Sequence, residues 1–144
     1  MKVDTILEGK GRHVETVRPD APLEIAVHKL SALGFGALVV SADGERLDGV
    51  ISERDVVQGL ARHGARLLEL TVSEVMSKRV PICSPDDTLQ HVMGEMTRTR
   101  QRHLPVVAGG RLVGVVSIGD VVKRRLEDMK LETNVLRDAY RGSR

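Results

Sequence analysis

Aromatic residues are almost absent from this 144-residue sequence: Phe35 and Tyr140 are the only two, and there is no tryptophan. Proteins that bind single-stranded nucleic acid normally stack bases on aromatic side chains, and this chain offers no such platform. Its 22 Lys and Arg residues nearly balance its 20 Asp and Glu residues, so its charge does not call for a polyanionic partner. We therefore expect no nucleic-acid partner, and we expect any bound base to lie between aliphatic side chains.

Cysteine is just as scarce. Cys83 stands alone in the sequence, so neither an intrachain disulfide nor a cysteine-rich metal site can form, which fits the reducing cytoplasm. Because Cys83 lies in a predicted strand and has no CxxC partner, we expect a buried thiol. Four histidines share no metal-ligand spacing, and we expect surface or half-buried side chains at His13, His28, His63 and His91.

Long apolar runs and catalytic motifs are also missing. No stretch approaches the ~18 apolar residues of a membrane-spanning helix, and the opening MKVDTILEGKG lacks the apolar region of a signal peptide. The sequence contains no HExxH, P-loop or GxGxxG motif and no Ser-His-Asp order. We expect a cytoplasmic protein that does not bind a membrane and is not an enzyme.

What the sequence does contain is an internal repeat. The segment VRPDAPLEIAVHKL at 17–30 returns as CSPDDTLQHVMGEM at 83–96, and GVISERDVV at 49–57 returns as GVVSIGDVV at 114–122. The spacing between the copies differs slightly for the two segments, which places short insertions in loops. Two diverged copies of one supersecondary unit are therefore predicted.

Each copy begins with a short strand, a Pro-Asp turn and a helix. The aspartates of the turns, Asp20 and Asp86, are predicted to be the N-caps of the two helices. Apolar residues then recur at the i, i+3, i+4, i+7 spacing of a helix with one buried face: Leu23, Ala26, Val27 and Leu30 in the first copy, and Leu89, Val92, Met93 and Met96 in the second.

A predicted β-hairpin and a second helix complete each copy. Asp43-Gly44 and Gly109-Gly110 separate β-branched runs, and such pairs favour tight hairpin turns because glycine tolerates a positive φ. The order is β-α-β-β-α, twice. A unit of this size cannot cover both faces of its sheet, so we expect an α/β (α+β) fold with the two repeats packed sheet against sheet around a pseudo-twofold axis. The clefts between the repeats are the natural ligand sites.

The connections divide the chain into three predicted segments. Residues 1–62 hold an N-terminal linker and the first repeat, residues 63–125 a linker helix and the second repeat, and residues 126–144 a helical extension. Thr71 to Glu74 resembles a capping box for the linker helix. The last helix is predicted from Ile118 to about Tyr140, with a partial apolar stripe that nothing in the chain obviously covers: Val122, Leu126, Met129 and Leu136.

This order of elements, with GVISERD at 49–55, GVVSIGD at 114–120 and HLPVV at 103–107, closely resembles the cystathionine β-synthase (CBS) domain family. The family signature is a glycine, two apolar residues, Ser or Thr, two variable residues and Asp. The resemblance covers nearly all of residues 11–125. It implies a pair of CBS repeats that binds adenosine-containing ligands and dimerises through its helices.

The position of the repeated motif indicates its chemistry. A strand that ends at Ser52 or Ser117 leads straight into a helix, so the hydroxyl and the first free backbone N–H groups face a cleft that favours an anion. Asp55 and Asp120, one turn later, can accept hydrogen bonds from two vicinal hydroxyls. Together these groups suit a nucleotide. Helix capping alone would also account for both serine–aspartate pairs, at about 1 kcal/mol each.

The family resemblance implies that aspartate binds the ribose, that serine binds ribose or phosphate, and that backbone and aliphatic groups hold the base. It also implies that basic residues on the second strand reach the phosphates, here Arg102 and His103. A solvated helix end is the alternative explanation of that basic segment. The matching positions in the first copy, Gly36 and Ala37, are small and uncharged and could instead line an adenine pocket.

The two clefts are expected to differ in charge. Arg54 adds a positive charge near the first cleft, whereas its counterpart Gly119 adds none. The predicted ligands are AMP, ADP, ATP or NAD, with S-adenosylmethionine ranked after them. We expect a homodimeric regulatory module that senses cellular energy state by changing conformation on binding. The alternative is a constitutive protein-interaction module that uses the same fold without a nucleotide.

Overall fold

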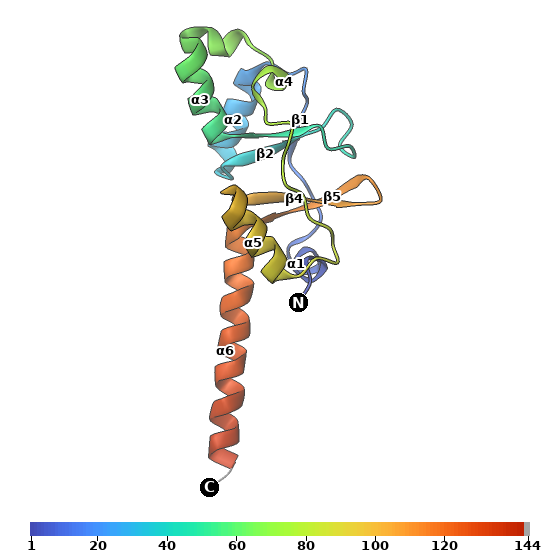
Figure 1. Cartoon of the computed structure of the whole chain (residues 1–144), viewed down its shortest axis with the longest axis vertical. Helices are drawn as coiled ribbons and strands as arrows, with labels where there is room; N and C mark the ends of the chain where they lie inside the picture. Colours follow the sequence, from blue (N-terminus) through green and yellow to red (C-terminus); the bar gives the residue numbers. More distant parts are fainter. Residues whose placement is uncertain (143–144) are drawn as a thin grey trace.

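The computed structural model describes residues 1–142 and shows two halves, each built from a small sheet with helices on one side. In Figure 1 the two sheets face each other across the middle of the molecule, and the shorter helices lie on the outer sides. This is the predicted α+β arrangement of two repeats.

The first half has a three-stranded sheet in the order β1-β2-β3. β1 runs parallel to β2, and β2 pairs antiparallel with β3, so that Ala37 lies opposite Ser52. The predicted β-α-β-β-α order is confirmed, with these bounds: β1 (Thr16–Val17), α2 (Leu23–Leu33), β2 (Ala37–Val40), β3 (Gly49–Ser52) and α3 (Glu53–His63).

The second half repeats this order with a smaller first strand. A single parallel bridge between Cys83 and Val106 takes the place of β1. The turn at Gly109 and Gly110 has φ values of 58° and 77°, as the predicted tight hairpin requires. The remaining elements are α5 (Leu89–Thr99), β4 (His103–Ala108), β5 (Arg111–Ser117) and α6 (Ile118–Gly142).

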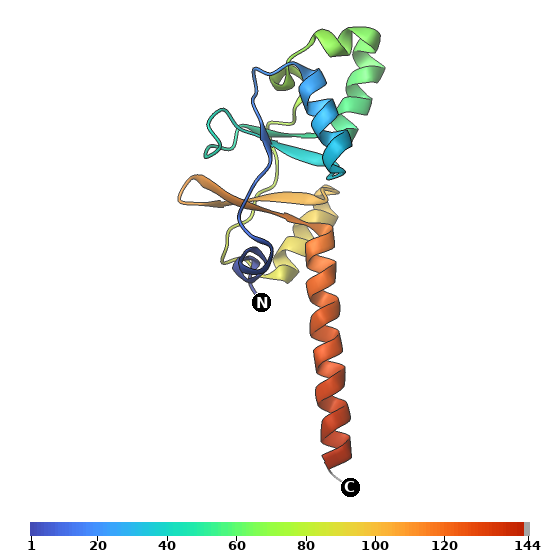
Figure 2. The same cartoon turned by 180° about the vertical axis from the view of Figure 1, so that it is seen from behind.

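α6 is the long last helix that the sequence predicted. It leaves the second half and continues as a single rod away from the rest of the molecule in both views (Figures 1 and 2). Every side chain from residue 129 to residue 141 is exposed. Residues 143 and 144 of the predicted extension lie outside the described residues.

The predicted N-caps of the two repeat helices are wrong. α2 begins after Pro22 and α5 after Thr88, whose hydroxyl accepts the N–H of His91 at 3.1 Å. Asp20 and Asp86 each lie two residues before these positions, because the Pro-Asp turn and the helix start are separate features. The apolar residues of both helices do form a buried face, apart from Val27, which is partly buried, and Met93, which is 37% exposed.

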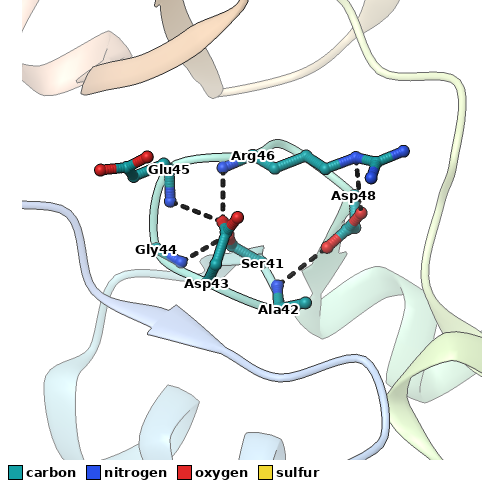
Figure 3. A network of polar contacts seen from close by, with 7 residues as sticks. All are labelled: Ser41, Ala42, Asp43, Gly44, Glu45, Arg46 and Asp48. Atoms are coloured by element: carbon teal, nitrogen blue, oxygen red, sulfur yellow. Dashed lines mark hydrogen bonds and ion pairs between the residues drawn. The ribbon is translucent and has the colours of Figure 1, made fainter.

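The first hairpin is also looser than predicted. Asp43 and Gly44 lie in a loop at 41–48 rather than in a tight turn. The Asp43 carboxylate accepts the N–H groups of Glu45 and Arg46 at 2.9 and 2.8 Å, and Figure 3 shows how these bonds fold the loop back on itself. The carbonyl of Glu45 accepts the N–H of Leu112, which ties the loop to the other half.

An N-terminal helix, α1 (Val3–Lys10), was not predicted, and it packs in the second half. Val3, Ile6 and Leu7 are buried in the same core as the side chains of α5, β4 and β5. Gly114 lies beneath this helix: a Cβ there would be 2.7 Å from Leu7 Cδ2. The glycine of the second repeated motif therefore makes room for α1.

The linker between the repeats packs in the first half as α1 packs in the second. It forms a 3-10 turn, η1 (Gly64–Glu69), and the short helix α4 (Val72–Val75), which place Leu67 and Val72 in the core of the first half. Thr71 is the N-cap of α4, but its hydroxyl bonds the Glu74 carboxylate and not the backbone, so the predicted capping box does not form.

α1 and the linker between the repeats make equivalent backbone hydrogen bonds to the halves that they complete. Val72 N–H donates to Ala21 O, and Val3 N–H donates to Asp87 O, both at 2.9 Å. Each half is thus completed by the segment that precedes the other half in the sequence. The division into residues 1–62, 63–125 and 126–144 stays a prediction. In space the two connecting segments are exchanged: α1 packs in the second half, and η1 with α4 packs in the first.

The role of α1 can be tested by a core substitution. Leu7→Ala is expected to lower the free energy of unfolding by about 2–5 kcal/mol, as for other buried leucines, because Leu7 is 1% exposed and packs over β5. Urea unfolding measures the change. Glu8→Ala, on the exposed side of the same helix, is the matched control and should change stability by less than about 0.5 kcal/mol. Equal effects of the two substitutions would contradict the packing of α1.

Candidate functional site

Both repeated motifs form the junction of a strand and a helix. In the first, the Ser52 hydroxyl accepts the Asp55 N–H at 3.2 Å while the Asp55 carboxylate accepts the Ser52 N–H at 2.9 Å, a complete capping box. In the second, Ser117 and Asp120 make the same two bonds at 3.1 and 2.9 Å. Capping is therefore a confirmed role of both pairs.

The first helical N–H of each junction is not free, contrary to the sequence prediction. Glu53 N–H donates to Gly36 O at 3.0 Å, and Ile118 N–H donates to Arg102 O at 2.8 Å. The third N–H of each helix is taken by the capping serine. An anion in these clefts would therefore depend mainly on side-chain charges.

Asp55 has a further partner that sequence reasoning missed. The Ser77 hydroxyl donates to Asp55 Oδ1 at 2.9 Å, and the Ser52 hydroxyl donates to Oδ2 at the same distance. Ser77 follows α4 and is held by a bridge to Val50. Both oxygens of this carboxylate thus accept hydrogen bonds within the protein, and a ribose hydroxyl would share Oδ1 with the Ser77 hydroxyl.

Asp120 has a charged partner, also missed from the sequence. Lys10, the last residue of α1, places its ammonium 2.7 Å from Asp120 Oδ2 and 3.0 Å from the carbonyl oxygen of Val115. Burial would raise the pKa of the Asp120 carboxyl, but the Lys10 ammonium and the Ser117 N–H hold it below its ordinary value. Asp120 is therefore an anion paired with a cation from α1.

His103 lies opposite Ser117 in the β4–β5 hairpin. Burial lowers the pKa of this imidazole, and the positive charges of Lys10 and Arg102 lower it further, while Asp120 acts in the opposite direction. The ring is therefore neutral near pH 7, and a bound phosphate would favour its protonation.

A cavity of about 790 Å³ lies between the two halves and brings together all the predicted site residues except Asp120. Both halves contribute walls, from the starts of β2 and α3 on one side and of β4 and α6 on the other. The predicted residues that line it are Gly36, Ala37, Ser52, Arg54, Asp55, Arg102, His103, Ser117 and Gly119. Ser77 and Arg100 line it as well.

A second cavity, of about 360 Å³, contains Asp120. Ala37, His103 and Ser117 line it too, so these three residues border both cavities. Lys10 and the segment before β1 close it on one side, and that segment was not among the predicted site residues. Its remaining walls are largely apolar: Val14, Leu33, Phe35, Leu38, Val39, Val50, Pro105 and Val115.

Comparison with known proteins now decides the family. The sequence profile of the CBS domain matches residues 11–62 and, a second time, residues 72–127. The chain belongs to the CBS domain family. The two matches cover both copies of the repeated motif and both capping pairs.

Several relatives share this CBS pair. The crystal structure of the CBS-domain protein ATU1752 from Agrobacterium tumefaciens is 43% identical, with a TM-score of 0.81 over 86% of this chain and 92% of that one. The CBS domain-containing protein YhcV of Bacillus subtilis is 30% identical over 80% of this chain and 81% of its own length. A third structure is the CBS pair of protein MJ0100 in complex with 5′-methylthioadenosine and S-adenosyl-L-methionine. It has a TM-score of 0.73 over 85% of this chain and 98% of that one. At 23% identity, the likeness shows a shared fold.

Residues 1–142 contain no group of three or more His, Cys, Asp or Glu side chains placed to hold a metal ion. Within the same residues, no helix is both long and apolar enough to cross a membrane. Cys83 is buried, as predicted, and burial, followed by the nearby charge of Asp87, raises the pKa of its thiol to about 12.

The lowered pKa of His103 predicts a pH dependence of stability. The unfolded chain binds more protons than the folded one between the folded pKa and the ordinary value of about 6.5. The stability that His103 contributes is therefore complete above that ordinary value and is lost as the pH falls through the folded pKa. His103→Gln should flatten the pH dependence of urea unfolding in this window. His28→Gln, at an exposed position, should not, and an unchanged profile for His103→Gln would contradict the assignment.

Proposed function

We propose that this CBS pair is a non-catalytic regulatory module that binds an adenosine nucleotide between its halves, with Asp120 on the ribose. The observation that carries the proposal is the cavity around Asp120. It combines apolar walls with a carboxylate, an ammonium and a neutral imidazole at one end. Ligand sites commonly have this composition, with a few polar groups that fix orientation in an apolar enclosure.

The apolar part of the cavity suits an adenine ring. Val14 and Val39 from the first half face the same space as Val115 and Pro105 from the second. Stacking between aliphatic side chains explains how a chain nearly without aromatic residues could hold a base. Phe35, one of its two aromatic residues, borders both cavities, and its exposed ring (49%) is available at the cavity mouth.

The polar end suits a ribose phosphate. Asp120 can accept hydrogen bonds from a 2′,3′-diol once Lys10 releases it, and the released ammonium is then beside the position of the phosphate. His103 gains a proton more readily next to that phosphate. Arg102, which lines the adjoining larger cavity, can reach further phosphates. These groups favour AMP, ADP, ATP or NAD over an uncharged nucleoside.

Related structures support an adenosine ligand without identifying it. The MJ0100 pair binds 5′-methylthioadenosine and S-adenosyl-L-methionine. Protein MJ1225 of Methanocaldococcus jannaschii, described as a putative archaeal homologue of γ-AMPK, is 25% identical to this chain, with a TM-score of 0.73 over 78% of this chain and 44% of that one. We place S-adenosylmethionine after the nucleotides, because Lys10 and Arg102 offer positive charge near the position of its cationic sulfonium.

Binding would act by changing how the halves sit against each other. Both halves line the cavity, so a ligand that prefers one arrangement shifts the population toward it. We further propose that the module is a cytoplasmic homodimer that reports cellular energy state to a target protein. Exposed apolar side chains on α3 offer a surface for such contacts: Val57 and Leu60 are 64% and 50% exposed.

The first experiment identifies any small molecule that stays bound to the protein through purification. The protein is denatured, and the released small molecules are recorded by ultraviolet absorbance and mass spectrometry. An adenine spectrum with a defined mass is the expected result, and the protein background is low because the chain has no Trp and one Tyr. An empty protein that also ignores added AMP, ATP and NAD in calorimetry would favour the constitutive interaction module.

The role of Asp120 gives a second test. Asp120→Ala should weaken binding of the identified nucleotide about tenfold or more, since hydrogen bonds to a charged group contribute about 1.5–3 kcal/mol. Asp55→Ala is the matched control, because it removes the same capping interaction in the other repeat. Calorimetry gives the affinities, and thermal unfolding shows that both variants fold. Equal losses, or a loss only for Asp55→Ala, would place the ribose elsewhere.

A further inference from the structure

The outer part of α6, residues 129–141, is exposed along its whole length. Both views show this part extending beyond the rest of the chain (Figures 1 and 2). Isolated helices of this length are marginal in water, because most helical stability in proteins comes from packing an apolar face. An apolar face is present here, so the question is what covers it.

The apolar face has the spacing of a coiled coil. Starting at Val122, steps of four and three residues alternate and reach Leu126, Met129, Thr133, Leu136 and Tyr140. These are the a and d positions of a heptad, and Thr133 is the single polar residue among them. The seam, as we call these six positions, is exposed, with values of 46% at Val122, 59% at Leu126 and 67% at Leu136.

Charges beside the seam indicate the partner and its direction. The e positions are all basic: Lys123, Lys130 and Arg137. An antiparallel pair would place these e positions side by side and would be repulsive. In a parallel pair each g position faces the e position of the partner's next heptad, which brings Glu132 opposite Arg137 of the second copy, twice by symmetry. Arg125 is also a g position and faces Lys130 of the second copy. The repulsion between these like charges offsets part of the attraction.

We propose that the α6 seam forms a parallel two-stranded coiled coil with a second copy of this chain. The proposal extends the homodimer named under the proposed function by fixing its direction: the second halves of the two copies lie beside each other. It also links the coil to the candidate site. α6 begins at Ile118, carries Asp120 in its first turn and continues as one helix into the seam.

Disulfide cross-linking tests the direction of the coil. In the full chain, Leu136→Cys places a thiol in the seam, and Leu131→Cys places one at an equally exposed position on the opposite side of the helix; both leucines are 67% exposed. A parallel coil brings the two copies of residue 136 within disulfide range. An antiparallel coil centred on the seam would separate them by about 15 Å. The native Cys83 is buried and should not react.

The expected result is a disulfide-linked dimer of Leu136→Cys under mild oxidation at micromolar protein, formed at least about tenfold faster than that of Leu131→Cys. Equal rates for the two variants, or no dimer of either, would overturn the proposal.

Charge substitutions give a second readout by equilibrium sedimentation. Glu132→Lys should weaken the dimer, and Glu132→Lys combined with Arg137→Glu should restore it. A 15.8 kDa monomer for the unaltered chain would equally overturn the coil.

Nucleotide binding is measured on the same variants and separates the two proposals. Residues 131, 132, 136 and 137 lie outside both cores and both cavities. Loss of the coil with intact binding would contradict only the coil. A cross-linked dimer that binds no nucleotide would contradict only the proposed function.

Discussion

The structure depends on the crossed packing of its connecting segments. Neither repeat closes its own core: α1 covers the second half, and η1 with α4 covers the first. The glycine that opens each repeated motif permits this approach, since a Cβ at Gly49 would lie 2.7 Å from the Ser77 carbonyl oxygen, and one at Gly114 would lie 2.7 Å from Leu7. The motif glycines thus make room for the segment that completes each half.

The same crossing supplies the partners of the two motif aspartates. Asp55 receives the Ser77 hydroxyl from the segment after α4, and Asp120 receives the Lys10 ammonium from the end of α1. The clefts are related by the repeat but differ chemically: a neutral hydroxyl bonds the aspartate of one, and a charged ammonium bonds the aspartate of the other. A ligand that took the place of Lys10 on Asp120 would remove one contact between α1 and α6.

Local patterns predicted most of the fold, whereas contacts distant in sequence were missed. The duplicated GVISERD and GVVSIGD segments predicted the starts of α3 and α6 and the serine–aspartate pairs, because a capping box and a strand–helix junction need only four neighbouring residues. Lys10 could not be found this way, since its partner Asp120 is 110 residues further on. The loop at 41–48 was not predicted for a related reason. Asp-Gly favours a tight turn, but the hydrogen bond between Glu45 and Leu112 in the other half holds a longer loop.

The crossed packing also sets the order in which the chain can mature during synthesis. α1 leaves the ribosome before every other helix described above, yet its apolar residues Val3, Ile6 and Leu7 are covered by elements that end near Val121. At about 5–20 residues per second, that interval is on the order of 5–20 s. The first half, in contrast, can close on α4 soon after residue 75 emerges. The N-terminal helix therefore cannot be covered, and the Asp120 cavity cannot be enclosed, until the last repeat has been synthesised.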